Sequence, residues 1–221
     1  MRRTRYDDIA DWYDGALATS QLGLSGRNIV LRLLGRGPGR LLDVGCGGGS
    51  HMLAFAAEGW SPVGVDSSSA QLDLARHRGC EVVAGRAEAL PFDDQSFDAA
   101  VSMWTHTDVD DFPAVLREIA RVLRPRGVLV YLGVHPCFVG PHSEFVQGLG
   151  VPRLHAGYRR VERYTDAPGI SPGGLRAKVG AVHSPLGVFV QAFLDAGFLL
   201  ERFEEPGDRE YPVPLALRAH T

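Results

Sequence analysis

Three glycines at alternate positions, directly after an apolar run, are the residues of this chain that best suit ligand chemistry. The run 41–44 ends at Gly45, and Gly47 and Gly49 follow. A glycine turn between a strand and a helix lets a ligand lie against the backbone, because glycine has no Cβ and tolerates positive φ. Free N–H groups in the turn and at the start of the helix favour an anionic group. The stretch predicts a nucleotide-like ligand.

A carboxylate stands at the end of the next apolar run, 63–66. Asp66 occupies the place where a βαβ nucleotide-binding fold puts the acid that binds ribose hydroxyls. A surface charge, or a cap for the next helix, is the alternative. The spacing departs from the dinucleotide fingerprint, because Ser50 stands at the third glycine position. The only lysine, Lys178, lies far from the turn, which excludes a phosphate loop of the GxxxxGK type.

Two histidines that follow predicted strands are candidate bases. His106 comes shortly after the apolar run 97–103. A histidine near neutral pH can take a proton from a hydroxyl or amine acceptor. A polar loop histidine without chemistry is the alternative, because a place in the sequence does not establish geometry. His135, directly after the run 128–134, is the second candidate.

Two groups of potential metal ligands have simpler interpretations. The segment 135–142 holds two histidines and a cysteine, but their spacing matches no standard zinc pattern and no fourth ligand is evident. Asp108, Asp110 and Asp111 precede a predicted helix, where N-capping by Asp110 or Asp111 is the more typical role. We therefore expect no metal site.

Positioning these residues requires a parallel sheet whose strands end at one edge. Apolar runs predict five such strands, at 41–44, 63–66, 81–84, 97–103 and 128–134. Apolar residues at helical spacing predict helices, at 6–20, 22–34, 70–75, 112–123 and 186–196. Two more strands are predicted at 198–205 and 213–220. The segment 135–184 is rich in Gly, Pro, His and Arg without a sustained period, so we expect an irregular insert with short helices.

The successive motifs resemble those of one family. LLDVGCGGGSHMLAFA, VGVDSSSAQLDLAR, GRAEALPFDDQSFDAAVS and LREIARVLRPRGVLVY are similar, in order, to the motifs of class I S-adenosylmethionine-dependent methyltransferases of the type-11 kind. The resemblance implies an α/β fold with a three-layer, Rossmann-like, seven-stranded sheet. The sheet is mostly parallel, with an antiparallel hairpin at its C-terminal edge. It also implies S-adenosyl-L-methionine as the cofactor.

The resemblance also implies where that cofactor would bind. Residues 6–14 are similar to an N-terminal lid whose tyrosines reach over the cofactor, although the same spacing suits packing on the core. An acid is common where Arg86 stands, so Glu88 becomes the candidate adenine-binding acid and the Ala87 backbone the candidate donor; Arg86 is otherwise a rim residue. Asp43 orients the turn or contacts the methionine amine through water. The implied contacts are Tyr13, Asp43, Gly45, Gly47, Gly49, Asp66, Ser67, Ala87, Glu88 and Met103.

Length and composition indicate one soluble domain. At 221 residues, the chain divides into an N-terminal helical lid (1–35), a cofactor-binding core (40–134), an acceptor-pocket insert (135–184), and a last helix with the edge hairpin (185–221). The net charge of −3 argues against a nucleic-acid partner. Three scattered cysteines give no disulfide framework, and no window approaches the ~18 apolar residues of a membrane span. We expect a cytoplasmic protein with no membrane partner, and the oligomeric state is left open.

The predicted activity is methyl transfer to an O or N atom of a small molecule, such as a specialised metabolite. Aromatic and histidine side chains of the insert would line the acceptor pocket: Phe138, Phe145, Tyr158, His135, His142, His155 and His183. Ser-Met-Trp-Thr at 102–105 replaces the Asn/Asp-Pro-Pro-aromatic segment of DNA and RNA amino-methyltransferases, which disfavours those acceptors. Two alternatives stay open: a protein that binds S-adenosylmethionine without transferring its methyl, and a nicotinamide oxidoreductase, which Ser50 disfavours.

Overall fold

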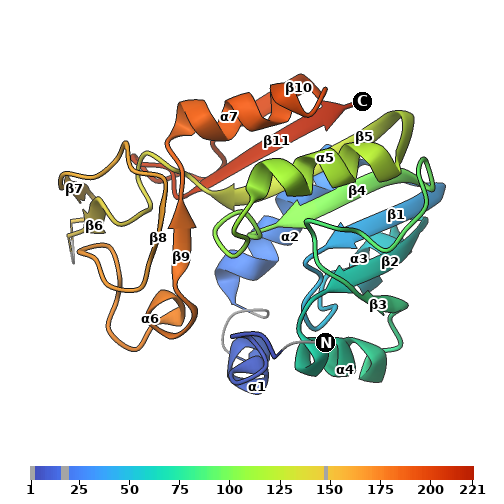
Figure 1. Cartoon of the computed structure of the whole chain (residues 1–221), viewed down its shortest axis with the longest axis horizontal. Helices are drawn as coiled ribbons and strands as arrows, with labels where there is room; N and C mark the ends of the chain where they lie inside the picture. Colours follow the sequence, from blue (N-terminus) through green and yellow to red (C-terminus); the bar gives the residue numbers. More distant parts are fainter. Residues whose placement is uncertain (1–2, 16–19, 147–148) are drawn as a thin grey trace.

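The computed structural model describes residues 3–15, 20–146 and 149–221. Its centre is a seven-stranded sheet in the order β10-β11-β5-β4-β1-β2-β3 (Figure 1). β11 is antiparallel to both β5 and β10, and the other neighbours are parallel. The predicted fold class is confirmed. The strands are β1 Gly39–Val44, β2 Trp60–Asp66, β3 Val82–Ala84, β4 Phe97–Met103, β5 Leu123–Val134, β10 Leu199–Glu204 and β11 Pro214–His220.

The strand order reverses between β1 and β4. β1 pairs with β2 on one side, where Val44 lies opposite Val65. It pairs with β4 on the other side, where Val44 lies opposite Ser102. The loops after β1 and β4 therefore lead to opposite faces of the sheet, and this divergence is where open α/β sheets bind ligands. The glycine turn lies at this point.

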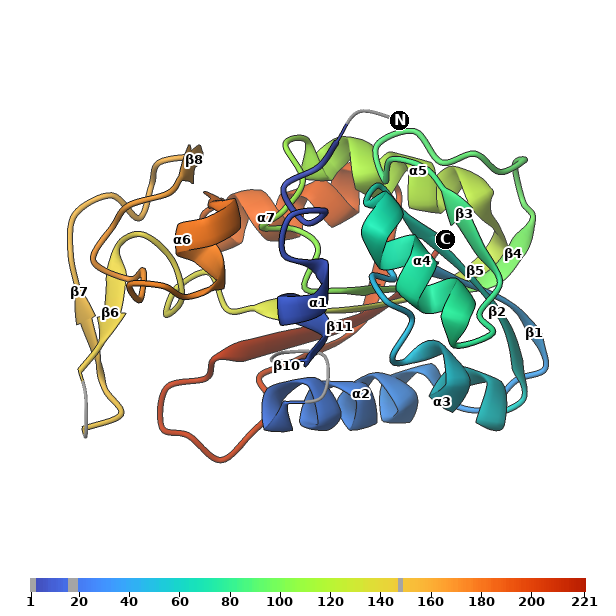
Figure 2. The same cartoon turned by 90° about the horizontal axis from the view of Figure 1, so that it is seen from below.

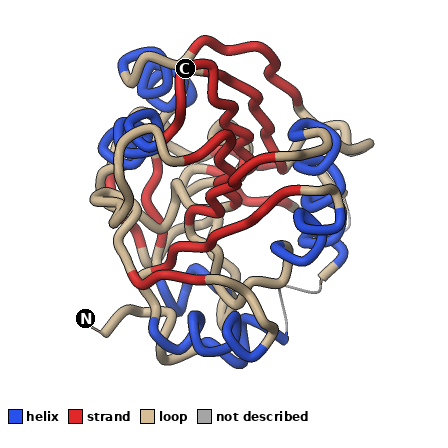
Figure 3. The backbone as a smooth tube through the Cα atoms, turned by 90° about the vertical axis from the view of Figure 1, so that its right-hand side faces the viewer, coloured by secondary structure: helices blue, strands red, loops and turns tan. Residues whose placement is uncertain are grey.

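Helices cover both faces of the sheet (Figure 3). α2 (Gln21–Leu34) and α3 (Met52–Ala57) share a buried cluster with one face, through Val30, Leu33 and Phe55. α5 (Phe112–Val122) and α7 (Leu186–Asp195) cover the other face, where Val115, Ile119 and Phe193 are fully buried. Burying apolar side chains at about 25 cal/mol per Å² is the main stabilising contribution to this layering.

Side-chain caps begin the helices near the site. Asp111 accepts a hydrogen bond from the N–H of Ala114 at 2.8 Å, at the start of α5. Ser68 accepts one from the N–H of Gln71 at 3.3 Å, at the start of α4 (Ser69–His77). Both caps satisfy backbone donors that have no partner within the helix. The predicted cap of α5 is confirmed, and Asp111 provides it.

The predicted N-terminal helix begins later than expected. α1 spans Ala10–Tyr13, and the predicted continuation over 16–19 lies outside the described residues. Asp7 accepts hydrogen bonds from the Thr4 N–H at 2.6 Å and from the Ser68 hydroxyl at 2.7 Å. A side chain that binds local and distant donors in this way competes with helical hydrogen bonding. Asp7 therefore contacts the start of α4, and the first turns of the predicted helix do not form.

The insert contains more strand than predicted. β6 (Ser143–Phe145) pairs with β7 (Pro152–Leu154), and β8 (Glu162–Tyr164) pairs with β9 (Ala181–His183). α6 (Leu175–Val179) is its one helix among the described residues. The expectation of short helices is therefore correct only for α6. Figure 2 shows the insert beyond one end of the sheet, and the N-terminal segment between α6 and α4.

None of the helices in the described part of the chain is long and apolar enough to cross a membrane.

Candidate functional site

The Asp66 carboxylate holds the glycine turn to the end of β2. Its two oxygens accept hydrogen bonds from the N–H groups of Gly47, at 2.9 Å, and Ser68, at 2.8 Å. Burial raises the pKa of Asp66, and these hydrogen bonds oppose the shift. Asp66 is not the cap of α4, because Ser68 has that role. Asp66 and Gly47 are thus brought together at the end of β2.

The glycine turn has a backbone that other groups can approach closely. Gly45, Gly47 and Gly49 have φ values of 75°, 52° and 73°. A Cβ on Gly45 would lie 2.4 Å from a methyl carbon of Thr105, so no side chain fits there. The positive φ and the close contact together explain why glycine is needed at Gly45.

The N–H groups of this turn do not face a ligand as expected from the sequence. Those of Gly45 and Cys46 donate to the Val65 carbonyl at 2.8 and 3.1 Å, and that of Gly49 donates to the Cys46 carbonyl at 3.0 Å. The Gly47 N–H is taken by Asp66. The expectation of bare donors for an anion is therefore wrong at these four positions. A phosphate-bearing ligand loses its main partners here, which disfavours a dinucleotide.

Two carboxylates give this edge of the sheet a negative charge. Asp43 is 4% exposed, and its pKa is raised to about 7, first by burial and then by the charge of Asp66. Among the described residues, neither Asp43 nor Asp66 forms an ion pair. A ligand that carries positive charge would favour the ionised carboxylates. The electrostatics therefore fit a sulfonium and an amine better than a phosphate.

Gln71 is a further polar residue of this site that the sequence analysis missed. It is 2% exposed, and both polar atoms of its amide lack a hydrogen-bond partner in the part of the chain that the structure describes. Its Oε1 lies 3.5 Å from the Cβ position of Gly47 and 3.4 Å from that of Gly48, so the amide lies against the glycine turn. Leaving such a group unpaired costs about 1–3 kcal/mol. The sequence offered one signal for Gln71: a polar residue among the residues that α4 buries, Leu72 and Ala75.

The N-terminal segment packs over this site. The rings of Tyr6 and Tyr13 meet edge to face at 5.2 Å. The pKa of Tyr13 is raised to about 12, mainly by burial and then by nearby charges that include Asp108 and Asp66. At the end of α1, Asp14 accepts a hydrogen bond from Arg78 at 2.5 Å, and Arg78 also donates to the Gly48 carbonyl at 2.6 Å. These contacts support the lid interpretation.

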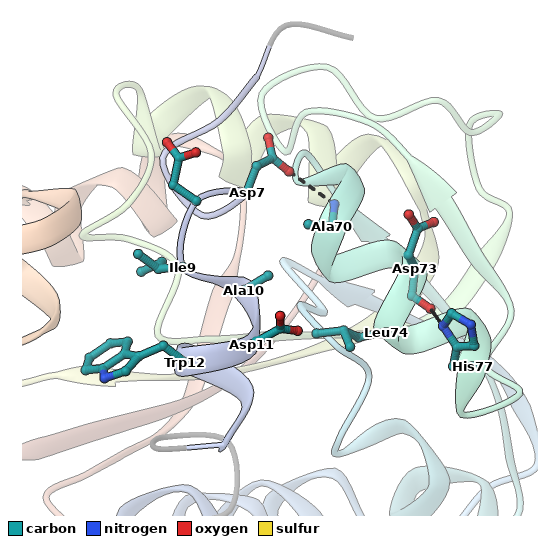
Figure 4. A pocket seen from close by; sticks show the side chains of 10 residues that line it. Asp7, Ile9, Ala10, Asp11, Trp12, Ala70, Asp73, Leu74 and His77 are labelled. Atoms are coloured by element: carbon teal, nitrogen blue, oxygen red, sulfur yellow. Dashed lines mark hydrogen bonds between the residues drawn. The ribbon is translucent and has the colours of Figure 1, made fainter.

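A groove of about 490 Å³ lies between α1 and α4, but it is separate from the residues above (Figure 4). Its walls include Asp8, Trp12 and Leu74, together with Asp73 and His77 from α4. Its lining contains neither Asp66 nor any glycine of the turn. The groove therefore marks the outer side of the contact between the lid and α4.

The adenine contacts expected from the resemblance find weaker support. Arg86 lies 3.2 Å from the Glu88 carboxylate, so the candidate acid already has a charged partner. The Met103 side chain packs on the α2 side of the sheet, and its Cε lies 3.7 Å from the Cβ position of Gly26. A contact from Met103 would therefore have to come from its backbone. Ala87 packs against the core cluster under α5.

His106 is buried in an aromatic cluster. It is 5% exposed, and its Nδ1 is hydrogen-bonded to the Tyr131 hydroxyl. The rings of Phe112 and Phe189 lie 5.9 and 5.3 Å from its own. Burial, followed by the charges of Arg176 and His183, lowers its pKa to about 3. His106 is therefore neutral at physiological pH, and its Nδ1 is engaged by Tyr131.

The second candidate base is engaged at both ring nitrogens. The Nε2 of His135 is 2.7 Å from a Glu205 carboxylate oxygen, and its Nδ1 accepts a hydrogen bond from the Cys137 N–H at 3.2 Å. Its ring packs on Phe138, which also contacts Tyr211. These contacts fix the start of the insert to the loop between β10 and β11. They do not bring His135 to His106.

Most of the predicted acceptor-pocket residues pack with one another inside the insert. His142 and His183 lie 4.9 Å apart by ring centres, and Tyr158 contacts both rings. The Nε2 of His142 is hydrogen-bonded to the Cys137 carbonyl at 3.0 Å, and that of His183 to the Tyr158 carbonyl at 2.8 Å. His155 lies 3.5 Å from Glu144. No three potential metal ligands gather within the described ranges.

Aspartates after β4 are bound by arginines of the insert. Asp108 accepts a hydrogen bond from Arg176 at 2.6 Å, and Asp110 accepts one from Arg163 at 2.7 Å. The sequence pattern indicated caps or metal ligands here, not ion pairs with distant arginines. Asp111 alone is the cap.

Comparisons with known proteins agree with this geometry. Residues 42–131 match the family described as "Methyltransferase domain". The chain is 35% identical over 142 residues to a demethylmenaquinone methyltransferase of Renibacterium salmoninarum, covering 62% of this chain and 60% of the relative. It is 40% identical over 103 residues to a phthiotriol/phenolphthiotriol dimycocerosates methyltransferase of Mycobacterium leprae, covering 44% and 38%.

The fold also matches a solved structure. The crystal structure of an S-adenosylmethionine-dependent methyltransferase from Mesorhizobium loti superposes with a TM-score of 0.75 and 22% identity, covering 93% of this chain and 100% of that one. The chain spans two fifths to three fifths of the length of the two curated relatives above. Residues 42–131 therefore match a methyltransferase-domain family, and the fold is that of an S-adenosylmethionine-dependent methyltransferase.

Proposed function

We propose that this protein transfers a methyl group from S-adenosylmethionine to an O or N atom of a small molecule, such as a specialised metabolite. The observation that carries the proposal is the Asp66 carboxylate, fixed on the glycine turn at the switch point of the sheet. Asp43 adds a second carboxylate to the same edge without a cationic partner among the described residues. The methyltransferase names of the relatives support the same chemistry.

The residues present fit this cofactor. Asp66 would accept hydrogen bonds from the ribose hydroxyls, and the unpaired Gln71 amide supplies a donor and an acceptor beside them. Asp43 would offset positive charge, and Tyr13 would cover the ligand from the lid. When bound, the cofactor supplies a methyl group on a positively charged sulfur.

The chain's own part in the reaction is alignment, exclusion of water and removal of a proton. The lid and the insert both lie against the loop after β4, through Tyr6 and Arg176. We propose His106 as the residue that takes the acceptor's proton, at Nε2. That role requires the tautomer in which Nδ1–H donates to Tyr131, because the other tautomer leaves no lone pair on Nε2.

One observation favours the alternative, a protein that binds S-adenosylmethionine without transferring its methyl. The pKa of His106 is lowered to about 3, which makes it a weak base. His135 has both ring nitrogens engaged. The two functions share the cofactor site and differ only in whether an acceptor reaches it.

Methyl-labelled S-adenosylmethionine incubated with the protein and a bacterial metabolite extract separates these functions. We expect label in a small molecule with the wild type, and none with Asp66→Ala. Cofactor binding without transfer to any extract fraction would favour the alternative. Tight NAD binding without S-adenosylmethionine binding would overturn the proposal.

A further inference from the structure

Asp108 lies where three segments distant in the sequence meet. Its Oδ1 accepts a hydrogen bond from the Tyr6 hydroxyl at 3.0 Å, and a second from Arg176 Nη1 at 2.6 Å. Tyr6 belongs to the N-terminal lid and Arg176 to α6 of the insert. One carboxylate oxygen in the loop after β4 therefore binds both segments that cover the site.

The insert is held to this loop by several further contacts. Arg176 Nη2 donates to the Thr107 hydroxyl at 2.7 Å, and the Val182 N–H donates to the Thr107 carbonyl at 2.7 Å. Arg163 donates to the Asp108 carbonyl at 3.1 Å. The side chains of Arg176 and Asp108 are each 23% exposed. A guanidinium this far removed from water needs a hydrogen-bonded carboxylate, so the pair fixes the position of Asp108.

On the other side, the lid leads to the cofactor site. Tyr6 packs edge to face on Tyr13. Asp7, its neighbour, accepts hydrogen bonds from the Ser68 hydroxyl at 2.7 Å and the Ala70 N–H at 3.1 Å. The Ser68 N–H in turn donates to Asp66. A continuous set of contacts thus runs from Arg176, through Asp108 and the lid, to the residue beside Asp66.

We infer that Arg176 is a positioning residue for the cofactor: it orients the Asp108 carboxylate that binds Tyr6, and so holds the N-terminal lid over the glycine turn. This inference rests on the proposed function. It assigns part of the cofactor affinity to a residue of the insert, 68 positions beyond Asp108 in the chain. Arg5 strengthens the same connection, because its guanidinium donates to the Val179 carbonyl of α6 at 3.0 Å.

Calorimetry with S-adenosylmethionine on Arg176→Met, Tyr6→Phe and the double variant tests this inference. Each single change should raise Kd about tenfold, as expected for the loss of a hydrogen bond to a charged group. Both side chains act through Asp108. The Kd of the double variant should therefore be no higher than that of the single variant with the higher Kd. Arg176→Lys should recover part of the affinity, because it keeps the positive charge.

Arg160→Met is the matched control. Arg160 lies in the same insert, is exposed, and its guanidinium has only a 3.8 Å ion pair, with Glu162, within the described part of the chain. Its Kd should equal that of the wild type. Additive effects of Arg176→Met and Tyr6→Phe, or an unchanged Kd in Arg176→Met, would overturn the inference.

Hydrogen exchange of the free protein separates this inference from the proposed function and from loss of the fold. Arg176→Met should increase exchange across residues 4–13 while the amides of β1 and β4 keep their protection. If the wild type fails to bind S-adenosylmethionine, the proposed function fails, and this exchange result still decides whether Arg176 holds the lid. Unchanged protection of residues 4–13 in Arg176→Met would refute that role.

Discussion

The Nδ1 of His106 and the hydroxyl of Tyr131 share a hydrogen bond inside a buried aromatic cluster. Burial opposes the imidazolium form and lowers the pKa of His106 to about 3. It also raises the pKa of Tyr131 above its usual value, so both side chains are uncharged at neutral pH. In the tautomer in which Nδ1–H donates to Tyr131, a proton that His106 receives arrives at Nε2, and this restricts how it can serve as a base.

Replacing His106 tests that role. His106→Asn should lower turnover by about 10²–10⁴-fold, the usual contribution of a general base, and leave the S-adenosylmethionine Kd unchanged. The pH profile of the wild type should show no inflection from His106 near pH 6–7, because its folded-state pKa lies near 3. His155→Asn, on the surface of the insert, is the control. A decrease of only a few-fold would show that alignment alone drives transfer.

The same shift predicts how stability depends on pH. The pKa of His106 is lower in the folded protein than in the unfolded chain, so the unfolded chain takes up the proton first as the pH falls. The free energy of unfolding should therefore decrease from about pH 6.5 toward pH 3. Denaturant titrations should show a smaller decrease in His106→Asn. An equal decrease in both proteins would contradict the shift.

Asp43 should make cofactor binding depend on pH as well. Its pKa of about 7 in the free protein means that it is mostly protonated at pH 6. A cationic ligand favours the ionised form, so binding should release a proton and the affinity should rise from pH 5.5 to pH 7. Calorimetry in buffers of different ionisation enthalpy measures the release.

Asp43→Asn provides the comparison for this titration. Its affinity should be nearly independent of pH over that interval, apart from any contribution of Asp66, whose pKa is also raised. Its folded state should also avoid the loss of stability that wild-type Asp43 causes as the pH rises from about 4 to 7, where the folded protein retains a proton that the unfolded chain releases. A wild-type affinity that is flat below pH 7 would refute this account.

Gln71 should have opposite effects on stability and binding. Gln71→Leu removes a buried amide without a partner among the described residues, so it should raise the free energy of unfolding of the free protein by about 1–3 kcal/mol. It should weaken S-adenosylmethionine binding, because the ligand loses that amide. Gln191→Leu, at an exposed position of α7, is the control. A destabilised variant with unchanged affinity would show that Gln71 is structural.

The strands and the acid at the end of β2 were predictable because their signals are local. Apolar runs, the glycine turn and the caps at Ser68 and Asp111 all act within a few residues. Four motifs in order then identified the family. The sequence therefore predicts, through the resemblance, a mostly parallel seven-stranded sheet with an antiparallel hairpin at its C-terminal edge.

The remaining features depend on contacts between distant residues. Arg176 and Asp108 are 68 residues apart, and no local pattern pairs them. The N-terminal helix begins only at Ala10, because Asp7 binds the start of α4. The hairpins of the insert have strands of three residues, too short to show a period. The free amide of Gln71 becomes visible only when its surroundings are known.

The S-adenosylmethionine affinity of Asp66→Ala tests the central claim most directly. The variant leaves the ribose hydroxyls without their acceptor, at a cost of roughly 1–3 kcal/mol, or about a 5- to 150-fold rise in Kd. Asp73→Ala is the matched control, because Asp73 lies on α4 and, among the described residues, its carboxylate pairs only with Arg76 at the surface. In calorimetry, we predict that Asp66→Ala binds S-adenosylmethionine more weakly than the wild type and that Asp73→Ala binds it equally well. Wild-type affinity in Asp66→Ala would contradict the assignment of the cofactor site.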